Sequence, residues 1–590
     1  MNMLFAQHKK LLALLCIGLG LLLAGCQTAT PEATEPVVAP ESVETEPAVT
    51  IVPPRQDFDC LSLDGPAIGP SKLVSGENLD STLPVVPGQI ILTGRQADIE
   101  LVKNALRDML EPIDRQAEQV ISFSPPPPVE GDGLTEGDEP LTAVLFDIGD
   151  LDISVAIQDV YQTVINLNEE RGGDDPLIVL ANANHLVAMP WGIDPGPWGI
   201  DPGPWGIDPG SGGGAPVLTQ IPGESDMGAW NQWALLTNEY GIGLYDTTVE
   251  PPQRTVAWDG EGVDVFIFDT SPFASSIKGQ DIMGRSMCVY HPKLLVEITP
   301  EGNSQVRQHG YFVAGLVRFV APDSQLHLVR VINEDGVGDV FSLLAVMSQL
   351  MDVRGDMNNS VVNLSLSVVE FEDDEQAPDF GPAADQADLL KDRMPDEYDD
   401  YLDDDHVLLA LERMMENMQD AGAVIVAASG NNSDRTIPVI QPAGMPARWP
   451  TTVAVAGNNI DGAFSCFSNW AETGNESGLR APAGDGVPHE GSGCNYPFHL
   501  PEYKCLPSSE GGYDCEVALT SVIWNNNATG YANWIGTSFA TPLVSGSAAL
   551  MLQASGGSCD TVEITDWLHN WQGVLEVEDA VAHAQGGCAP

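Results

Sequence analysis

Residues 263–270, VDVFIFDT, form a short run dominated by Val, Ile and Phe that ends in the polar pair Asp269 and Thr270. Such a run is typical of a strand buried on both faces, because a strand with one face in water alternates apolar and polar residues. Four similar runs follow along the chain: LHLVRVI (326–332), SVVNLSLS (360–367), AVIVAAS (423–429) and TTVAVAG (451–457).

Segments with the apolar spacing of helices lie between these runs. They are FVAGLVRFV (312–320), VFSLLAVMSQL (340–350) and VLLALERMMENMQDAG (407–422). The alternation predicts an α/β fold over residues 227–590, with a doubly wound, mostly parallel sheet that helices cover on both faces. Functional sites of such sheets lie at the carboxyl ends of the strands.

A smaller α+β domain is predicted upstream, over residues 58–189. Its expected elements are a strand (88–94), a helix (97–113), two strands (119–123 and 141–148), a second helix (154–170) and a last strand (177–182). The order β-α-β-β-α-β is that of a ferredoxin-like fold. No group of residues with catalytic potential stands out in it, so we expect a structural or regulatory role.

The charge of the chain is strongly one-sided, with 85 acidic and 24 basic residues and a net charge of −61. A surface this negative repels phosphate backbones, so a nucleic-acid partner is excluded. Since 43% of the residues are hydrophobic, the chain can build full cores, and wholesale disorder is excluded as well.

The first 25 residues combine Lys9 and Lys10 with the apolar run LLALLCIGLGLLLAG and contain no acidic residue. This pattern predicts an export signal, because the run is short for a membrane span. It ends in Leu-Ala-Gly-Cys at 23–26, which resembles the lipobox of bacterial lipoproteins; the resemblance implies cleavage before Cys26 and lipidation of that residue. We therefore expect an exported protein, lipid-anchored to a bacterial membrane in the periplasm or at the cell surface. An ordinary signal peptide with an incidental cysteine is the alternative.

Two segments are predicted to be linkers. Residues 26–57 are rich in Pro, Thr, Glu and Val without periodicity, which is typical of an extended tether. Residues 190–210 repeat PWGIDPG three times, and a Gly-rich stretch continues to residue 226. Proline and glycine in every unit exclude a helix or a central strand. A Trp-bearing ligand or a processing site is the alternative for the repeats.

Eight cysteines remain once the signal segment and Cys26 are set aside, and none forms the CxxC pairs of zinc sites. An even number in an exported chain favours disulfides. Close spacing suggests Cys505–Cys515 or Cys494–Cys505, and a Cys559–Cys588 bond would hold the C-terminus. Sequence does not determine the connectivity. The eight are Cys60, Cys288, Cys466, Cys494, Cys505, Cys515, Cys559 and Cys588.

Three polar residues lie where predicted strands end or helices begin. Asp269 ends VDVFIFD, His309 opens the helix of HGYFVAGLV, and Ser538 opens that of GTSFATPLVSGSAALML. A serine hydroxyl needs a base to act as a nucleophile, and a histidine base needs a carboxylate to orient it. The helix N-terminus after Ser538 adds positive potential where an oxyanion would develop. Each residue alone would usually be a cap or a packed residue; together, in this order, they predict a catalytic triad.

The order Asp, His, Ser, with the motifs DTS, HGYFVAG and GTSFATP, resembles the subtilisin-like serine peptidases (subtilases) over about residues 227–590. The resemblance implies that Asp269 orients His309, that His309 is base and then acid, and that Ser538 attacks the scissile carbonyl. It also implies that Asn431 of AASGNN, rather than the adjacent Asn432, holds the oxyanion with the Ser538 N–H.

The resemblance further implies a substrate cleft formed by two strand ends and a pocket floor. Its expected residues are Ser365, Leu366, Ser367, Ala428, Ser429, Gly430 and Gly444. Two positions depart from the family pattern: Ser271 stands where glycine is usual, and Tyr311 where a small hydroxylic residue is usual. Neither removes a catalytic group, but both could reshape this cleft.

Residues 370–405 carry sixteen acidic and two basic residues and are predicted to be a solvated insertion. They could instead overhang the cleft and favour basic substrates. No spacing of the Asp-x-Asp-x-Asp-Gly type is present, so structural calcium cannot be assigned to particular residues and no metal ligand is expected. The expected chemistry requires no cofactor.

By position and fold, residues 58–189 resemble subtilase prodomains, which assist folding and inhibit until they are cut away. Cleavage in the 190–226 linker would then release the peptidase from the membrane, unless the prodomain stays bound or Cys60 pairs with Cys288. The expected protein is thus a self-processed serine endopeptidase acting on proteins or peptides, with activity that falls below about pH 6–7 as the histidine gains a proton. The alternative from another class is a catalytically silent scaffold or binding protein with the same fold. An acid-active serine-carboxyl peptidase is excluded, because it needs glutamate where His309 stands.

Overall fold

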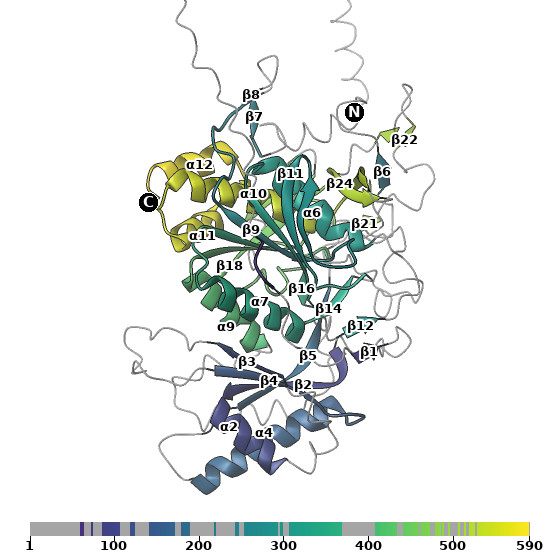
Figure 1. Ribbon diagram of the computed structural model, residues 1–590, viewed down its shortest axis with the longest axis vertical. Coiled ribbons are helices and arrows are strands. Elements are labelled where there is room, and N and C mark those ends of the chain that lie inside the picture. The colour runs from purple at the N-terminus through teal and green to yellow at the C-terminus, as the bar shows by residue number, and fades with distance from the viewer. Residues whose placement is uncertain are drawn as a thin grey trace, which may run out of the picture. The chain divides into compact units, whose positions relative to one another are not determined.

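Figure 1 shows the computed structural model of the chain. No helix among the described residues is long and apolar enough to span a bilayer. The structure describes residues 60–63, 72–74, 85–106, 119–123, 141–171, 177, 179–188, 217–219, 242–246, 253–292, 296–298, 306–334, 336–368, 408–433, 441–459, 462–471, 478–484, 487–488, 494–495, 506–507, 513–514, 519–525 and 528–588.

A nine-stranded sheet forms the centre of the C-terminal part. Every neighbouring pair is parallel except the first, an antiparallel hairpin. In spatial order the strands are β10 (Ile277–Ile282), β11 (Arg285–Tyr290), β13 (Gln325–Arg330), β9 (Asp264–Asp269), β15 (Ser360–Leu364), β17 (Ala423–Ala428), β18 (Thr452–Asn458), β19 (Leu479–Pro482) and β26 (Gly573–Val574).

Helices cover both faces of this sheet (Figure 1). Val265 and Ile267 of β9 belong to one buried cluster, and Phe266 and Phe268 belong to the other, as expected for a strand whose side chains alternate between two cores. The doubly wound, mostly parallel sheet predicted from the apolar runs is confirmed. The first face packs against α6 (His309–Val320), α10 (Thr537–Ser555), α11 (Thr561–Asn570) and α12 (Val577–Gln585), and the second against α7 (Val340–Arg354) and α9 (Leu409–Asp420).

The upstream module contains six elements in the predicted order. Its strands are antiparallel in the order β5-β2-β4-β3, and residues of both helices share one buried cluster with the sheet. Its assignment as a ferredoxin-like prodomain stays a prediction. The elements are β2 (Val85–Arg95), α2 (Gln96–Ala105), β3 (Gln119–Phe123), β4 (Leu141–Asp147), α4 (Ile153–Arg171) and β5 (Val179–Ala188).

Strand β5 also pairs with two short strands of the C-terminal part. It runs antiparallel to β14 (Val337–Asp339) and to β16 (Ser367–Val368), so that Ala188 lies opposite both Val337 and Ser367. No feature of the sequence predicted this pairing.

The remaining described elements are short, apart from a hairpin that packs on α6. They are β1 (Lys72–Val74) with β12 (Val296–Ile298), the sheet of β24 (Leu519–Asn525), β25 (Ala528–Trp534) and β6 (Val217–Thr219), the pairs β7 (Tyr245–Asp246) with β8 (Gln253–Arg254), β20 (Val487–Pro488) with β21 (Cys494–Asn495) and β22 (Leu506–Pro507) with β23 (Tyr513–Asp514), and η2 (Val306–Gln308).

Several sequence-based predictions lie outside the described residues. They concern the signal segment and Cys26, the tether 26–57, the PWGIDPG repeats, the acidic insertion 370–405, and the pairings that involve Cys505. Among the described cysteines, Cys60 is bonded to Cys288 and Cys559 to Cys588. Cys466 is disulfide-bonded as well.

Candidate active site

The carboxyl end of β9 and the amino end of α6 bring an aspartate and a histidine together. Nδ1 of His309 lies 2.9 Å from both Oδ1 and Oδ2 of Asp269. Asp269 is fully buried, and His309 is 3% exposed. A carboxylate accepts only, so Nδ1 must carry the proton that it donates. In the neutral ring Nε2 is then the basic nitrogen.

A glycine and a threonine hold β9 and α6 in contact. A Cβ on Gly310 would lie 2.9 Å from Cβ of Asp269 and closer still to the carbonyl oxygen of Thr270, so only glycine fits between strand and helix. The Thr270 hydroxyl accepts a hydrogen bond from the Gly310 N–H (3.1 Å) and donates to the carbonyl of Arg307 (3.2 Å). The residues on either side of the pair thus fix its spacing.

A second support for His309 comes from the hairpin β24–β25, and sequence reasoning missed it. Gln308 donates from Nε2 to the carbonyl of Trp524 (2.7 Å) and accepts at Oε1 from the Trp524 N–H (2.8 Å). The rings of Trp534 and Phe539 pack against the imidazole at centroid distances of 5.4 and 5.0 Å. His309 is therefore enclosed by aromatic groups, which limits its rotamers.

Ser538 is the second residue of α10 and follows Thr537 and the N-cap residue Gly536, whose φ of 145° is unfavourable for other residues. Its hydroxyl donates a long hydrogen bond, 3.4 Å, to the carbonyl of Ser365, while the Ser365 hydroxyl donates to the Ser538 carbonyl (2.8 Å). Among the described contacts, none is a hydrogen bond between Ser538 and His309. Catalytic hydrogen bonds are often long or unformed without substrate. Phe539, the residue that follows Ser538, packs against the His309 ring, so the serine lies close to the histidine.

The Asn431 side chain is oriented by the residue before the serine. Both the N–H and the hydroxyl of Thr537 donate to Oδ1 of Asn431, each at 2.9 Å. Because these donors require an oxygen, the network assigns Nδ2 to the other end of the amide, which can donate toward the amino end of α10. Asn431 is 3% exposed, whereas the neighbouring Asn432 is exposed.

Asn469 supports the segment that carries Asn431, and the sequence offered no signal for it. Its Oδ1 accepts from the Asn432 N–H (2.9 Å) and the Ser433 hydroxyl (3.0 Å), and its Nδ2 donates to the carbonyl of Ser429 (3.2 Å). A Cβ on Gly430, which has a φ of 110°, would meet this amide at 2.5 Å.

The residues predicted to line a substrate cleft lie side by side. A Cβ on Gly444 would be 4.0 Å from both Cβ of Ser367 and the carbonyl oxygen of Ser429, and the Gly444 N–H donates to that oxygen (2.9 Å). Ser365 and Leu366 are fully buried at the end of β15, and Ala428 is fully buried at the end of β17.

The two departures from the family pattern lie in the interior rather than on an open surface. Tyr311 is fully buried, donates its hydroxyl to the Asp281 carbonyl (2.9 Å) and packs edge-on against Phe273. The Ser271 hydroxyl, 3% exposed, accepts from the Phe273 N–H (3.3 Å). The Tyr311 ring is part of the core that packs α6 against the sheet, and its effect on the cleft stays a prediction.

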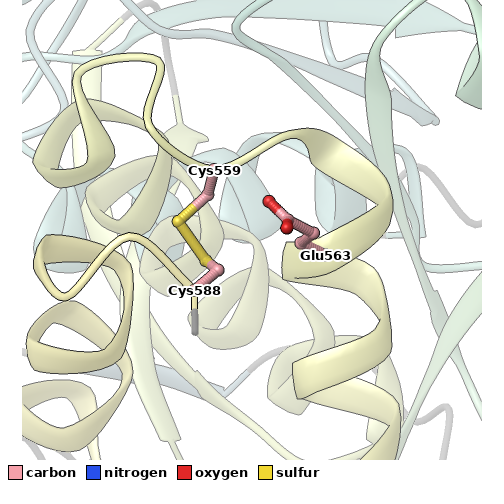
Figure 2. A group of neighbouring side chains, drawn as sticks. All are labelled: Cys559, Glu563 and Cys588. Atoms are coloured by element: carbon pink, nitrogen blue, oxygen red, sulfur yellow. A yellow bond between two sulfur atoms is a disulfide. The ribbon is translucent and has the colours of Figure 1, made fainter. Parts of the chain in front are cut away.

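One group among the described residues has the spacing of metal ligands: Cys559, Glu563 and Cys588. Figure 2 shows that the two sulfurs form a disulfide, with the Glu563 carboxylate beside it. That carboxylate accepts from the Asp560 N–H (2.9 Å) as half of a capping box that begins α11. The group is a structural element and offers no thiolate to a metal.

Comparisons with known proteins give a match to one family and a likeness to a solved structure. The model of the subtilase family, Peptidase S8, matches residues 270–585. A solved structure described as a cold adapted subtilisin-like serine proteinase is 21% identical, covers 58% of this chain and 97% of its own, and has a TM-score of 0.33. No protein of curated function matches the chain.

Proposed function

The chain belongs to the subtilase family of serine peptidases, and from this premise we propose that it is an exported endopeptidase that cuts proteins or peptides through Asp269, His309 and Ser538. The observation that carries the proposal is the buried Asp269–His309 pair beside α10, which carries Ser538 in its first turn. The silent scaffold is not favoured, since the pair and Asn431 are both in place.

The proposed reaction begins with attack of the Ser538 hydroxyl oxygen on the scissile carbonyl carbon, while His309 takes the hydroxyl proton at Nε2. Asp269, hydrogen-bonded at Nδ1, stabilises the imidazolium that forms. The new oxyanion accepts hydrogen bonds from Asn431 Nδ2 and from the Ser538 N–H, which has no partner inside its own helix.

Collapse of this intermediate breaks the C–N bond, and His309 returns its proton to the departing amine. The acyl group remains on Ser538 as an ester. Water then attacks the ester carbonyl, again with His309 as base, and releases the carboxylic acid and the free serine. In this last step His309 takes a proton from the water and gives it to the Ser538 oxygen as the ester bond breaks.

We also propose that residues 58–189 act as a prodomain. The pairing of β5 with β16 places Val187 and Ala188 along Ser367 and Val368, where an extended substrate would pair. Asn184 of β5 adds polar contacts, since it donates to Asp339 (3.1 Å) and accepts from the Phe341 N–H (3.1 Å) at the start of α7. Self-cleavage in the 190–226 linker and lipidation at Cys26 are parts of the proposal that rest on the sequence.

The test is the reaction of a soluble form lacking residues 1–26 with a fluorophosphonate, followed by intact-mass measurement beside Ser538→Ala. The serine oxygen displaces fluoride, so one phosphonyl group should be added to the wild type and none to the variant. The same spectra show whether the linker has been cut. A folded wild-type protein that is free of its N-terminal module and gains no adduct would contradict the proposed peptidase.

A further inference from the structure

The catalytic part binds a second upstream segment, at a place separate from β5. This segment, residues 60–63, is called here the N-terminal strap. Cys60 is bonded to Cys288 in β11, across 228 positions of sequence. Cys288 is fully buried in the core on the α7 side of the sheet, and Leu63 of the strap, 4% exposed, belongs to the same core.

Hydrogen bonds also hold the strap. The Leu61 N–H donates to the Tyr290 hydroxyl (3.0 Å), which lies 2.9 Å from Nδ1 of His327. Nε2 of His327 lies 2.9 Å from Asp264, and this carboxylate pairs with Arg354 (2.6 Å). With the proton of His327 on Nε2, the Tyr290 hydroxyl donates to Nδ1 of His327, and Nε2 donates to Asp264. The contacts from Leu61 to Arg354 thus form a continuous row of polar groups. The strap is thus seated on a buried polar row of the catalytic sheet.

Strand β1 extends this attachment. Residues Lys72–Val74 run parallel to Val296–Ile298, so the chain stays on the catalytic part beyond the strap. The disulfide, the Leu61 hydrogen bond and the β1–β12 pairing involve no residue of β5, β14, β16 or the Asp269–His309 pair.

The Cys60–Cys288 bond joins two parts of the chain that lie on opposite sides of the β2–β5 module and the linker. Cys60 precedes the whole β2–β5 module, and Cys288 follows the linker. A cut between Ala188 and Ile242 divides the chain in two but leaves both pieces joined through this bond. A second cut between Leu63 and Val85 would remove the module and still leave the strap on the catalytic part.

We propose that the Cys60–Cys288 bond keeps the anchor-bearing N-terminus attached to the catalytic domain after the linker is cut, so that removal of the module does not release the peptidase. This rests on the proposed function for the anchor and the processing step. Linker cleavage was expected to free the enzyme unless Cys60 pairs with Cys288, and the structure contains that bond. As long as the chain between Cys26 and Cys60 is intact, release requires reduction of the bond: two thiols supply two hydrogens, the S–S bond breaks, and the reductant leaves as a disulfide.

The experiment separates this proposal from the chain's own activity. The test uses a full-length Ser538→Ala chain, which cannot cut itself by the proposed mechanism. The recognition sequence of a site-specific protease replaces residues 204–210 of the linker, and addition of that protease cuts the linker. We expect one species of full mass on a denaturing gel without reductant, and two fragments with dithiothreitol. Two fragments without dithiothreitol would overturn the proposal.

Two paired variants provide the controls. Cys60→Ser with Cys288→Ser should give two fragments without reductant, whereas Cys559→Ser with Cys588→Ser should behave as the parent chain, because that bond closes a loop within one fragment. Should the first pair fold poorly, iodoacetamide on the unreduced, denatured parent gives an independent answer. Alkylation of Cys60 or Cys288 would overturn the proposal.

Membrane release is measured on the same chain when lipidated and bound to sedimented vesicles. After the cut, the catalytic fragment should pellet with the vesicles and move to the supernatant only when dithiothreitol is added. Its appearance in the supernatant without dithiothreitol would overturn the retention. If the uncut chain fails to pellet, the proposed lipid anchor is wrong, and the gel result still decides whether the bond joins the two pieces.

Discussion

Replacement of Gly310 by alanine tests whether the spacing of β9 and α6 sets the catalytic rate. The added Cβ would lie 2.9 Å from both Cβ of Asp269 and Cδ1 of Leu328. Carbon atoms in contact prefer about 3.5–4.0 Å, so strand and helix must separate by about 0.6–1 Å. The displacement acts directly on the 2.9 Å separation of His309 from Asp269.

A displacement of about 1 Å in a catalytic group can lower a rate by about 100-fold, so we expect kcat of Gly310→Ala to fall by roughly 10- to 100-fold. Overpacking should also lower the free energy of unfolding by about 1–3 kcal/mol. The rate is measured with a peptide substrate after titration of the fraction of reactive serine, which removes the contribution of unfolded enzyme.

Gly546→Ala is the matched control. A Cβ there would lie 2.6 Å from Cβ of Val320, in the contact between α10 and α6 but at the far end of α6 from His309. It should lower stability by a similar amount with kcat per reactive serine close to that of wild type. The reasoning would be refuted by an unchanged kcat in Gly310→Ala, or by equal losses of kcat in both variants.

Three further predictions concern the oxyanion, the pH dependence and a buried cation. Asn431→Leu should lower kcat by about 100- to 1,000-fold with KM nearly unchanged; a loss confined to KM would refute its role. Burial lowers the pKa of His291 to about 4, with a smaller effect from Arg330. As the pH falls, the unfolded state therefore binds this proton before the folded state does. Between about pH 7 and 4 the free energy of unfolding of wild type should fall by on the order of 3 kcal/mol more than that of His291→Gln. An equal fall in the two proteins would refute this. Arg318 donates to the carbonyls of Pro322, Ser324 and Ser286, so Arg318→Met should cost about 3–5 kcal/mol in thermal or urea unfolding, whereas Arg285→Met, which breaks a surface pair with Asp323, should cost less than about 1. Equal costs would contradict the argument.

The sequence predicted the sheet and the meeting of Asp269 with His309, because both follow from rules that act locally. Apolar runs mark buried strands, and parallel strands bring their carboxyl ends to one edge. Asp269 ends one of these strands and His309 begins the helix beside it, so both lie at this edge. Gly444 was likewise placed beside Ser367 and Ser429 by resemblance, and the structure brings the three together.

The supports of the site could not be predicted in the same way. Gln308 and Trp524 are 216 positions apart, and a glutamine beside a histidine carries no local signal that it will pair with a hairpin backbone. Asn469 is one asparagine among many. Tyr311 was singled out because a small hydroxylic residue is usual at its position, but it lies two residues after His309, about 200° around the helix, and so faces the core.

The described segments between Cys60 and Ala188 are attached to the catalytic part in two different ways, by strand pairing and by a covalent bond. β5 pairs with β14 and β16 through backbone hydrogen bonds, which any extended peptide can form, so a substrate that binds as proposed would compete with it. The Cys60–Cys288 bond has no such competitor. While that bond is intact, β5 remains at an effective concentration on the order of millimolar even after the linker is cut. Inhibition by the module should therefore persist on dilution until the module itself is degraded, and attachment to the anchor should outlast the inhibition.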